Sequence, residues 1–212
     1  MFFDTDQPHG LPHSPFNALV VPRPIGWIST LSSTGVPNLA PYSFFNAVAY
    51  QPPQVMFAGS GSHAEGGLKD TVANIEATGE FVVNLATWAL RTHMNESSTP
   101  APRNVDEFEA VGLEKAPSAL VAPPRVAASP AHLECRLSQI VELETSSPDI
   151  VNRLTVGHVV GIHIDDAVLT DGLVDMEKLK PVARLGYMDY TVVTDVFTMN
   201  RPPWPLSQGD AD

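Results

Sequence analysis

The chain has 212 residues, of which 43% are hydrophobic and 17% are charged, a composition typical of globular proteins. Domains commonly span about 100 to 200 residues, so we expect a single domain over residues 1–212. With 24 acidic against 12 basic residues the net charge is −12, which argues against nucleic-acid and membrane-surface partners. No apolar run approaches the roughly 20 residues that a membrane-spanning helix needs.

The amino-terminal stretch and the cysteine content predict where the protein resides. The first residues, MFFDTDQPHGLPHSP, carry acids and prolines where a signal peptide has basic and then apolar residues. The single Cys135 excludes an internal disulfide and fits a reducing compartment. We therefore expect a cytoplasmic protein.

Short segments with β-type patterns run along most of the chain. Its 20 prolines argue against a helical bundle, because a proline inside a helix costs about 3 kcal/mol. Alternating runs bounded by turn residues indicate strands, and the first two, joined by STGVPN, predict a hairpin. We expect strands at residues 25–31, 39–50, 55–58, 80–86, 132–144 and 156–164.

The segment 132–144 shows the clearest alternation. Leu133, Cys135 and Leu137, with Val141 and Leu143, would lie on a buried face, and Glu134 and its alternate neighbours on a polar face. In that pattern Cys135 is a small buried hydrophobe rather than a nucleophile. Residues 156–164 are the expected pairing partner of this strand.

Three segments have helical signals. In KDTVANIEATGE, Asp70 is a candidate cap and Gly79 a stop signal, and further helices are expected at 87–95 and 106–111. The Pro- and Ala-rich residues 116–130 predict an ordered loop. Many short strands with proline and glycine between them favour a closed or nearly closed antiparallel barrel, with helices packed outside.

The loop GSGSHAEGGLKDT, residues 59–71, matches neither the P-loop nor the dinucleotide-binding spacing of glycines and lysine. Its hydroxyls on Ser60, Ser62 and Thr71, the cation Lys69 and the start of a helix would nevertheless suit a phosphate. On these features alone, a purely structural Gly/Ser turn is the stronger interpretation. We expect no metal site, since the seven histidines are scattered, and no G-x-S-x-G nucleophile motif is present.

Residues 22–57 contain the most informative stretch, PRPIGWISTLSSTGVPNLAPYSFFNAVAYQPPQVMF. Arg23 is held between two prolines, and the next extended run carries Ser43, Asn46 and the adjacent Phe44 and Phe45. One interpretation is an aromatic hairpin that covers a core. The other is a groove with aromatic walls, as a planar cofactor requires.

PRPIGWIST, NLAPYSFFNAVAYQPPQVMF and KDTVANIEATGEFVVNLA, in this order and at these separations, resemble the flavin reductase-like, FMN-binding split-barrel family. With the late segment PVARLGYMDYTVV, the resemblance covers about residues 15–193. It implies a mainly β fold, a Greek-key split barrel of about six antiparallel strands with peripheral helices. It also implies a homodimer with FMN bound near the subunit interface, with FAD as the alternative flavin.

The resemblance assigns site residues position by position. The strand with Ser29, Thr30 and Leu31 would offer backbone groups to the flavin pyrimidine. The ring and ribityl chain would meet Ser43, Phe44, Phe45 and Asn46, and the phosphate would meet Ser60, Ser62, Lys69, Asp70 and Thr71. Arg23 is a further cofactor-binding candidate, and Arg184 would either close the site or come from the partner subunit. Two departures concern HAEGG, where many relatives have an arginine, and Tyr187, where closing segments of the type RLGG have glycine.

The resemblance implies flavin chemistry rather than a catalytic side chain, because the flavin itself accepts the hydride. We expect an NAD(P)H-dependent flavin reductase that passes electrons to an acceptor such as a monooxygenase. The alternative is a flavin-binding electron carrier that does not itself oxidise NAD(P)H at a useful rate. A third, weaker hypothesis is a barrel that has lost its cofactor and serves as a binding scaffold.

Overall fold

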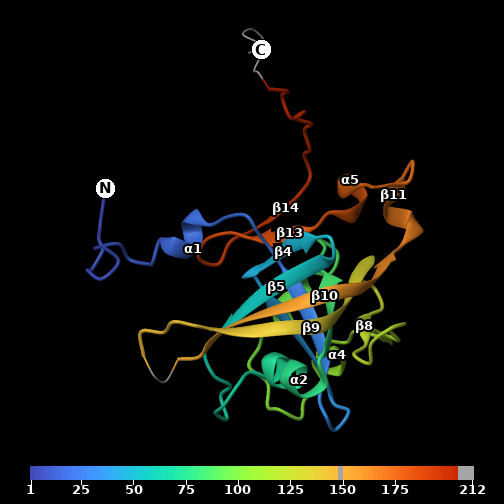
Figure 1. The fold of residues 1–212 in the computed structure, drawn as a ribbon, viewed down its shortest axis with the longest axis horizontal. Coiled ribbons are helices and arrows are strands. Elements are labelled where there is room, and N and C mark those ends of the chain that lie inside the picture. The colour runs from blue at the N-terminus through green and yellow to red at the C-terminus, as the bar shows by residue number, and fades with distance from the viewer. Residues whose placement is uncertain (148–149, 205–212) are drawn as a thin grey trace.

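The computed structural model describes residues 1–147 and 150–204 (Figure 1). Within them, seven strands form one antiparallel sheet in the order β3–β2–β6–β9–β10–β5–β4. The expected mainly β architecture is confirmed. The strands are Gly26–Leu31 (β2), Pro37–Tyr42 (β3), Phe45–Tyr50 (β4), Pro53–Ser60 (β5), Glu80–Leu85 (β6), Ala131–Leu143 (β9) and Asn152–Ile164 (β10).

Residues 39–50 form two strands where one was predicted. β3 pairs with β2 in the expected hairpin, whereas β4 pairs with β5, so that β3 and β4 are the two edges of the sheet. Only Ser43 and Phe44 connect them, and two residues span too short a distance for separated edges. The sheet is therefore curled into a barrel that is open between β3 and β4. No glycine or proline marks the break, so the sequence pattern missed it.

β9 and β10 pair along their length as predicted, but the alternation of β9 changes at a bulge. Leu137 pairs with Gly157 and Gln139 with Val156, which leaves Ser138 as an extra residue. One extra residue moves the following side chains to the opposite face, so Ile140 packs against the core while Val141 is exposed. The prediction that Val141 and Leu143 share the buried face was wrong for this reason.

The prediction that Glu134 lies on a polar face was also wrong, because its side chain is completely buried. Its carboxylate accepts hydrogen bonds from the backbone N–H groups of Ala119 and Leu120 at 2.7 and 2.6 Å, and it pairs with His163. A loop from the predicted 116–130 region covers this face of the strand. That region also contains the short paired strands Lys115–Ala116 (β7) and Arg125–Val126 (β8).

The helices lie near the expected places with shifted starts. α2 spans Asp70–Thr78 and ends at Gly79, whose φ of 73° is left-handed and whose N–H donates to the carbonyl of Ile75. α3 is limited to Arg91–Glu96, and α4 spans Glu107–Ala110 after a cap at Asp106. None of the helices in the described residues is long and apolar enough to span a membrane.

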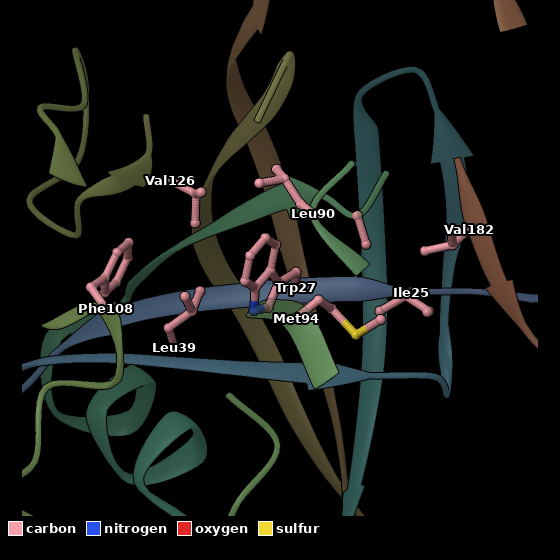
Figure 2. Close-up of a cluster of buried hydrophobic side chains, with 9 residues drawn as sticks. Ile25, Trp27, Leu39, Leu90, Met94, Phe108, Val126 and Val182 are labelled. Carbon is pink, nitrogen blue, oxygen red and sulfur yellow. The ribbon is translucent and has the colours of Figure 1, made fainter. Parts of the chain in front are cut away.

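Two clusters of buried side chains form the core. Figure 2 shows the first, in which Trp27 of β2 lies among side chains from α3, α4 and β3. The indole Nε1 of Trp27 donates to Ser97 Oγ at 2.9 Å. The second cluster lies between α2 and the sheet and contains Ile75, Phe81 and Cys135. The predicted burial of Cys135 is confirmed, and that burial raises the pKa of its thiol.

A small sheet joins the beginning and the end of the described chain. Its order is β1–β13–β14, with bounds Arg23–Pro24, Val182–Arg184 and Tyr190–Val192. After β14 the chain leads away from the body of the molecule (Figure 1). The remaining elements are α1 (Phe16–Leu19), η1 (Asp166–Val168), β11 (Leu169–Thr170), β12 (Leu173–Val174) and α5 (Met176–Leu179).

Candidate functional site

A cavity of about 330 Å³, which we call the α2 cavity, lies at the amino-terminal end of α2. Its other walls come from the β3–β4 connection, the end of β5 and residues 97–101. Six of the residues predicted from the sequence line it together: Ser43, Phe44, Ser60, Lys69, Asp70 and Thr71. The segments PYSFF and GSGSHAEGGLKDT, separated in the sequence, thus meet at one place.

Lys69 is the N-cap residue of α2 and is half-buried in the wall of this cavity. Its side chain makes no capping hydrogen bond, so no N-cap side chain occupies the N–H groups of the first turn. The positive end of the helix dipole therefore faces the cavity without a cap. Within residues 1–147 and 150–204 its ammonium group makes no hydrogen bond or ion pair. An unpaired cation at a helix start, beside the Ser60 hydroxyl, favours a bound anion.

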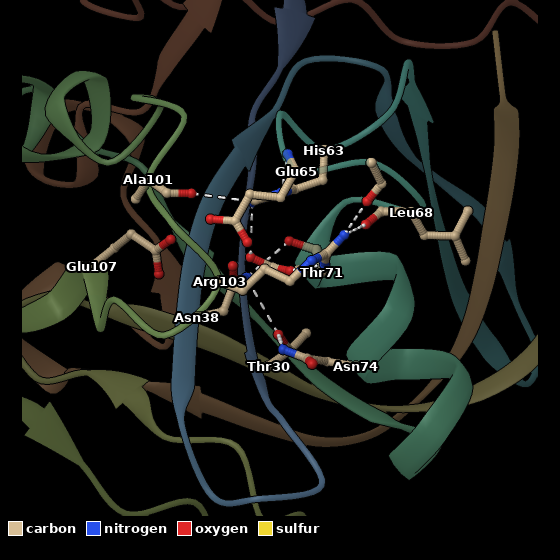
Figure 3. A network of polar contacts seen from close by, with 12 residues as sticks. Thr30, Asn38, His63, Glu65, Leu68, Thr71, Asn74, Ala101, Arg103 and Glu107 are labelled. Atoms are coloured by element: carbon tan, nitrogen blue, oxygen red, sulfur yellow. Dashed lines mark hydrogen bonds and ion pairs between the residues drawn. The ribbon is translucent and has the colours of Figure 1, made fainter. Parts of the chain in front are cut away.

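The prediction that Asp70 caps the helix was wrong, because Asp70 is the first helical residue. Its carboxylate forms an ion pair with Arg103 and lies 3.5 Å from His63 Nε2 (Figure 3). Arg103 also donates to the carbonyls of Gly66 and Leu68. The loop that lacks the arginine expected from the resemblance is therefore held by an arginine from a distant segment.

His63 fixes the other side of the same loop. Its Nδ1 accepts from the backbone N–H of Glu65 at 3.0 Å, so Nε2 carries the proton and donates to the carbonyl of Ala101 at 3.1 Å. Gly66 and Gly67 have φ values of 87° and 73°, a region that glycine enters without strain. HAEGG is thus an ordered turn that brings Lys69 to the cavity.

A buried polar network lies beneath the cavity (Figure 3). Asn38 Nδ2 donates to Thr71 Oγ1 at 2.9 Å and to Thr30 Oγ1 at 3.3 Å, while Asn74 donates to Thr30 Oγ1 at 3.0 Å. These bonds connect β2, β3 and α2. Thr30 therefore fixes the position of α2, and its side chain is fully buried.

Two further ionisable groups belong to the cavity wall. Burial raises the pKa of Tyr42 to about 12, so this phenol stays neutral near pH 7. Burial also raises the pKa of Glu107, although its Oε2 accepts from the backbone N–H of Leu39 at 3.0 Å. The wall thus contains Glu107 as an acidic group whose charge is disfavoured.

A second cavity, of about 390 Å³, adjoins the first because Ser43 and Phe44 line both. We call it the arginine cavity, since Arg23 and Arg184 also line it. They are directly opposed across the β1–β13 pair. Burial, and then the charge of Arg184, lower the pKa of Arg23.

Arg184 is tied to the turn that follows it. Its guanidinium donates to the phenol oxygen of Tyr190 and to the carbonyl of Tyr187. Tyr187 has a φ of 55°, which is uncommon for a bulky residue, and it replaces the glycine of the RLGG pattern. Its side chain lines the arginine cavity and contacts His13, with 5.6 Å between ring centroids.

The remaining predicted residues do not meet in these cavities. Ser29 is buried and donates to the carbonyl of Pro124 at 2.6 Å, and its backbone lies between β3 and β6. Leu31 pairs with Pro37 of β3 and lies beyond the β2–β6 register, which spans Gly26–Ser29. The ladder on both sides uses the backbone groups around Ser29, so they are not available to a ligand. Phe45 packs against the core, whereas Asn46 and Ser62 are exposed.

Sequence reasoning missed Arg103, His63, Asn38 and Glu107. Arg103 is one of few basic residues in an acidic chain, which is a weak signal, but nothing local connects it with a loop more than 30 residues earlier. Among the described residues no group of three or more His, Cys, Asp or Glu side chains could hold a metal ion.

Comparison with known proteins identifies the family. The sequence model described as "Flavin reductase like domain" matches residues 18–182, and the chain belongs to this family. An uncharacterised protein of Deinococcus radiodurans is 42% identical over 205 residues, covering 93% of this chain and 87% of that protein.

Solved structures agree with this assignment. Component B of nitrilotriacetate monooxygenase from Bacillus cereus is 28% identical, with a TM-score of 0.86 over 94% of this chain and 98% of that chain. The 2-nitrobenzoate 2-nitroreductase NbaA of Pseudomonas fluorescens is 29% identical, with a TM-score of 0.78 over 92% of each chain. Split-barrel structures also match, so the predicted split-barrel fold is confirmed.

Proposed function

We propose that this member of the flavin reductase-like family binds FMN and transfers electrons from NAD(P)H through the flavin to an acceptor. Family membership supports flavin-linked oxidoreductase chemistry. The observation that carries the proposal is the unpaired Lys69 at the uncapped start of α2, in a chain of net charge −12. A local cation in so acidic a protein supports an anionic ligand such as a phosphate.

The residues of the α2 cavity fit FMN. Lys69, the first-turn N–H groups of α2 and the Ser60 hydroxyl would hold the phosphate. Ser43 would donate to the ribityl chain, and Phe44, which is partly exposed between the two cavities, offers an aromatic surface to the ring. A bound flavin supplies the group that accepts and releases the hydride. Arg103 compensates the charge of Asp70, which would otherwise repel the phosphate.

The names of the two structural neighbours support an electron-transferring role. One is a component of a monooxygenase and the other a nitroreductase, both redox proteins. We therefore propose an acceptor outside this chain, either a partner oxygenase or a small molecule. The donor is NADH or NADPH.

The second candidate is a flavin-binding electron carrier without appreciable NAD(P)H oxidation. Tyr187 favours it, because its ring narrows the cavity beside Phe44 where relatives of the RLGG type have glycine. Anaerobic mixing of the FMN-loaded protein with NADH or NADPH separates the two candidates. Loss of flavin absorbance within seconds supports the reductase, and persistent absorbance supports the carrier. If the protein retained no flavin after reconstitution with FMN, both would be excluded.

We also propose a homodimer. The segment after β14 leaves several large apolar side chains exposed, among them Val196, Phe197, Met199 and Trp204. Burying them against a second copy would remove this apolar surface from water. Sedimentation equilibrium tests the assembly, and a monomer at micromolar concentration would exclude it.

A further inference from the structure

The arginine cavity has a charge pattern that the proposed flavin-phosphate contacts leave unexplained. None of the described residues that line it is acidic, although the chain has twice as many acidic as basic residues. Among residues 1–147 and 150–204, neither Arg23 nor Arg184 forms an ion pair with a carboxylate. Like charges directly opposite each other on paired strands are destabilising. An anion between them would remove this cost.

Arg23 carries a more specific sign of a missing partner. Its side chain is only 8% exposed, and it donates to the carbonyls of Val20 and Leu185 at 2.7 and 3.0 Å. Its Nε is nevertheless buried and has no hydrogen-bond partner among the residues that the structure describes. Leaving such a donor unsatisfied is costly. Because almost none of the Nε surface is exposed, a ligand oxygen would reach this donor after a small shift of the Arg23 side chain.

The walls of this cavity limit what such an anion can be. Phe44 lies on the side shared with the α2 cavity, with its ring centroid 5.8 Å from Arg23 Cζ. Tyr187 provides a second aromatic wall. The volume of about 390 Å³ is within the range of about 300 to 1,000 Å³ found for small-molecule sites. Aromatic walls favour a planar ring, and guanidinium groups favour a carboxylate.

The aromatic wall formed by Tyr187 depends on a strained backbone conformation. A φ of 55° lies in the left-handed region, where a bulky residue is strained. The hydrogen bond from Arg184 to the Tyr187 carbonyl maintains the conformation. On the other side, a Cβ at Gly186 would lie 2.5 Å from Ala18 Cβ, so α1 packs directly on this turn. The cavity is therefore preformed between the two ends of the chain.

We propose that the arginine cavity binds the small-molecule electron acceptor of the flavin site. This acceptor is a planar aromatic carboxylate, held by Arg23 and Arg184 and stacked against Tyr187. This inference rests on the proposed function, because the cavity meets the FMN site at Ser43 and Phe44. A ring placed there would lie beside the flavin.

Calorimetric titration of the FMN-loaded protein with sodium benzoate tests the proposal, with cyclohexanecarboxylate as a non-planar probe of equal charge. Benzoate is expected to bind, and cyclohexanecarboxylate more weakly. Arg184→Gln should weaken benzoate binding by about 10- to 100-fold, since it removes a charged hydrogen-bond donor. Arg91→Gln is the matched control, because Arg91 stacks on Trp88 outside this cavity, and it should leave benzoate affinity unchanged.

Two further variants protect the test against a folding defect. Arg184→Lys keeps the charge but loses the bidentate geometry, so an intermediate loss of benzoate affinity is expected. In Tyr187→Gly, glycine adopts the left-handed backbone conformation without strain, and the aromatic wall is removed. The affinity for benzoate should therefore fall more than the affinity for cyclohexanecarboxylate. Circular dichroism establishes that each variant is folded.

Three results would overturn the proposal: no benzoate binding to the wild type, equal benzoate affinity in folded Arg184→Gln and wild type, or a loss of FMN in Arg184→Gln that matches the loss of benzoate. The last result would assign the arginines to the flavin itself. Repeating the titration without flavin separates this inference from the proposed function. A wild type that binds benzoate but not FMN contradicts the proposed function alone.

Discussion

The α2 cavity and the arginine cavity share Ser43 and Phe44 but create positive potential in different ways. In the first, acidic groups are present, and Arg103 compensates Asp70 while Lys69 and the helix start stay available. In the second, none of the wall residues within 1–147 and 150–204 is acidic, and two arginines oppose each other. An acidic chain can thus form an anion site in two ways: a nearby cation neutralises the carboxylate in the wall, or the wall contains no carboxylate.

Lys69→Ala is the strongest test of the α2 cavity. It should weaken FMN binding by about 10- to 100-fold and riboflavin binding much less, because a charged contact to the phosphate is lost. Flavin fluorescence titration measures both affinities. Lys115→Ala is the control, since Lys115 is paired with Asp106 and Glu109 and lines neither cavity. Equal losses for the two flavins would remove Lys69 from the phosphate site.

Arg103→Ala tests the compensation of charge in the α2 cavity. The variant leaves the carboxylate of Asp70 without its main partner and releases two loop carbonyls, so the free energy of unfolding should fall by about 1 to 3 kcal/mol. Urea unfolding measures this change. The double variant Arg103→Ala, Asp70→Asn should regain part of the loss, because no unpaired carboxylate remains. Unchanged stability of Arg103→Ala would show that the loop does not need this anchor.

Two serines of one loop provide a matched pair with a smaller effect. Ser60 lines the α2 cavity, whereas Ser62 is exposed and lines neither cavity. Ser60→Ala should weaken FMN by about two- to tenfold, as expected for one hydrogen bond, and Ser62→Ala should not. The same titration measures both variants. The reverse order would move the phosphate toward the middle of the loop.

Glu107→Gln should have the smallest effect, and its effect depends on pH. Because burial raises the pKa of Glu107, the charged carboxylate lowers folding stability as the pH rises through that pKa. Glutamine removes this loss, so the stability of the variant relative to the wild type should increase as the pH rises above the ordinary carboxylate pKa and through the raised pKa of Glu107. Its FMN affinity should rise by up to about fivefold. A stability difference independent of pH would contradict the assigned burial effect.

The sequence predicted the features that depend on short-range patterns. The β2–β3 hairpin, the β9–β10 pair, the end of α2 at Gly79 and the burial of Cys135 all follow from alternation or turn residues. The sequence did not predict the features that depend on contacts between distant segments. Glu134 is buried because a loop covers it, and Arg103 reaches Asp70 across 33 residues of sequence.

The candidate site divides in the same way. Lys69, Ser60 and Phe44 lie where the local motifs indicated, at one cavity. Ser29 and Thr30 belong to equally recognisable motifs, but Ser29 is paired with both β3 and β6, and the hydroxyls of both residues are hydrogen-bonded in the interior. A motif identifies a segment, while burial and pairing decide which of its residues can reach a ligand.

The affinities of the wild-type protein for FMN and riboflavin, measured side by side by fluorescence titration, test the central claim most directly. If Lys69 and the start of α2 hold a phosphate, FMN binds at least about tenfold more tightly than riboflavin. Equal affinities would show that the phosphate contributes nothing and would contradict the assignment of the α2 cavity.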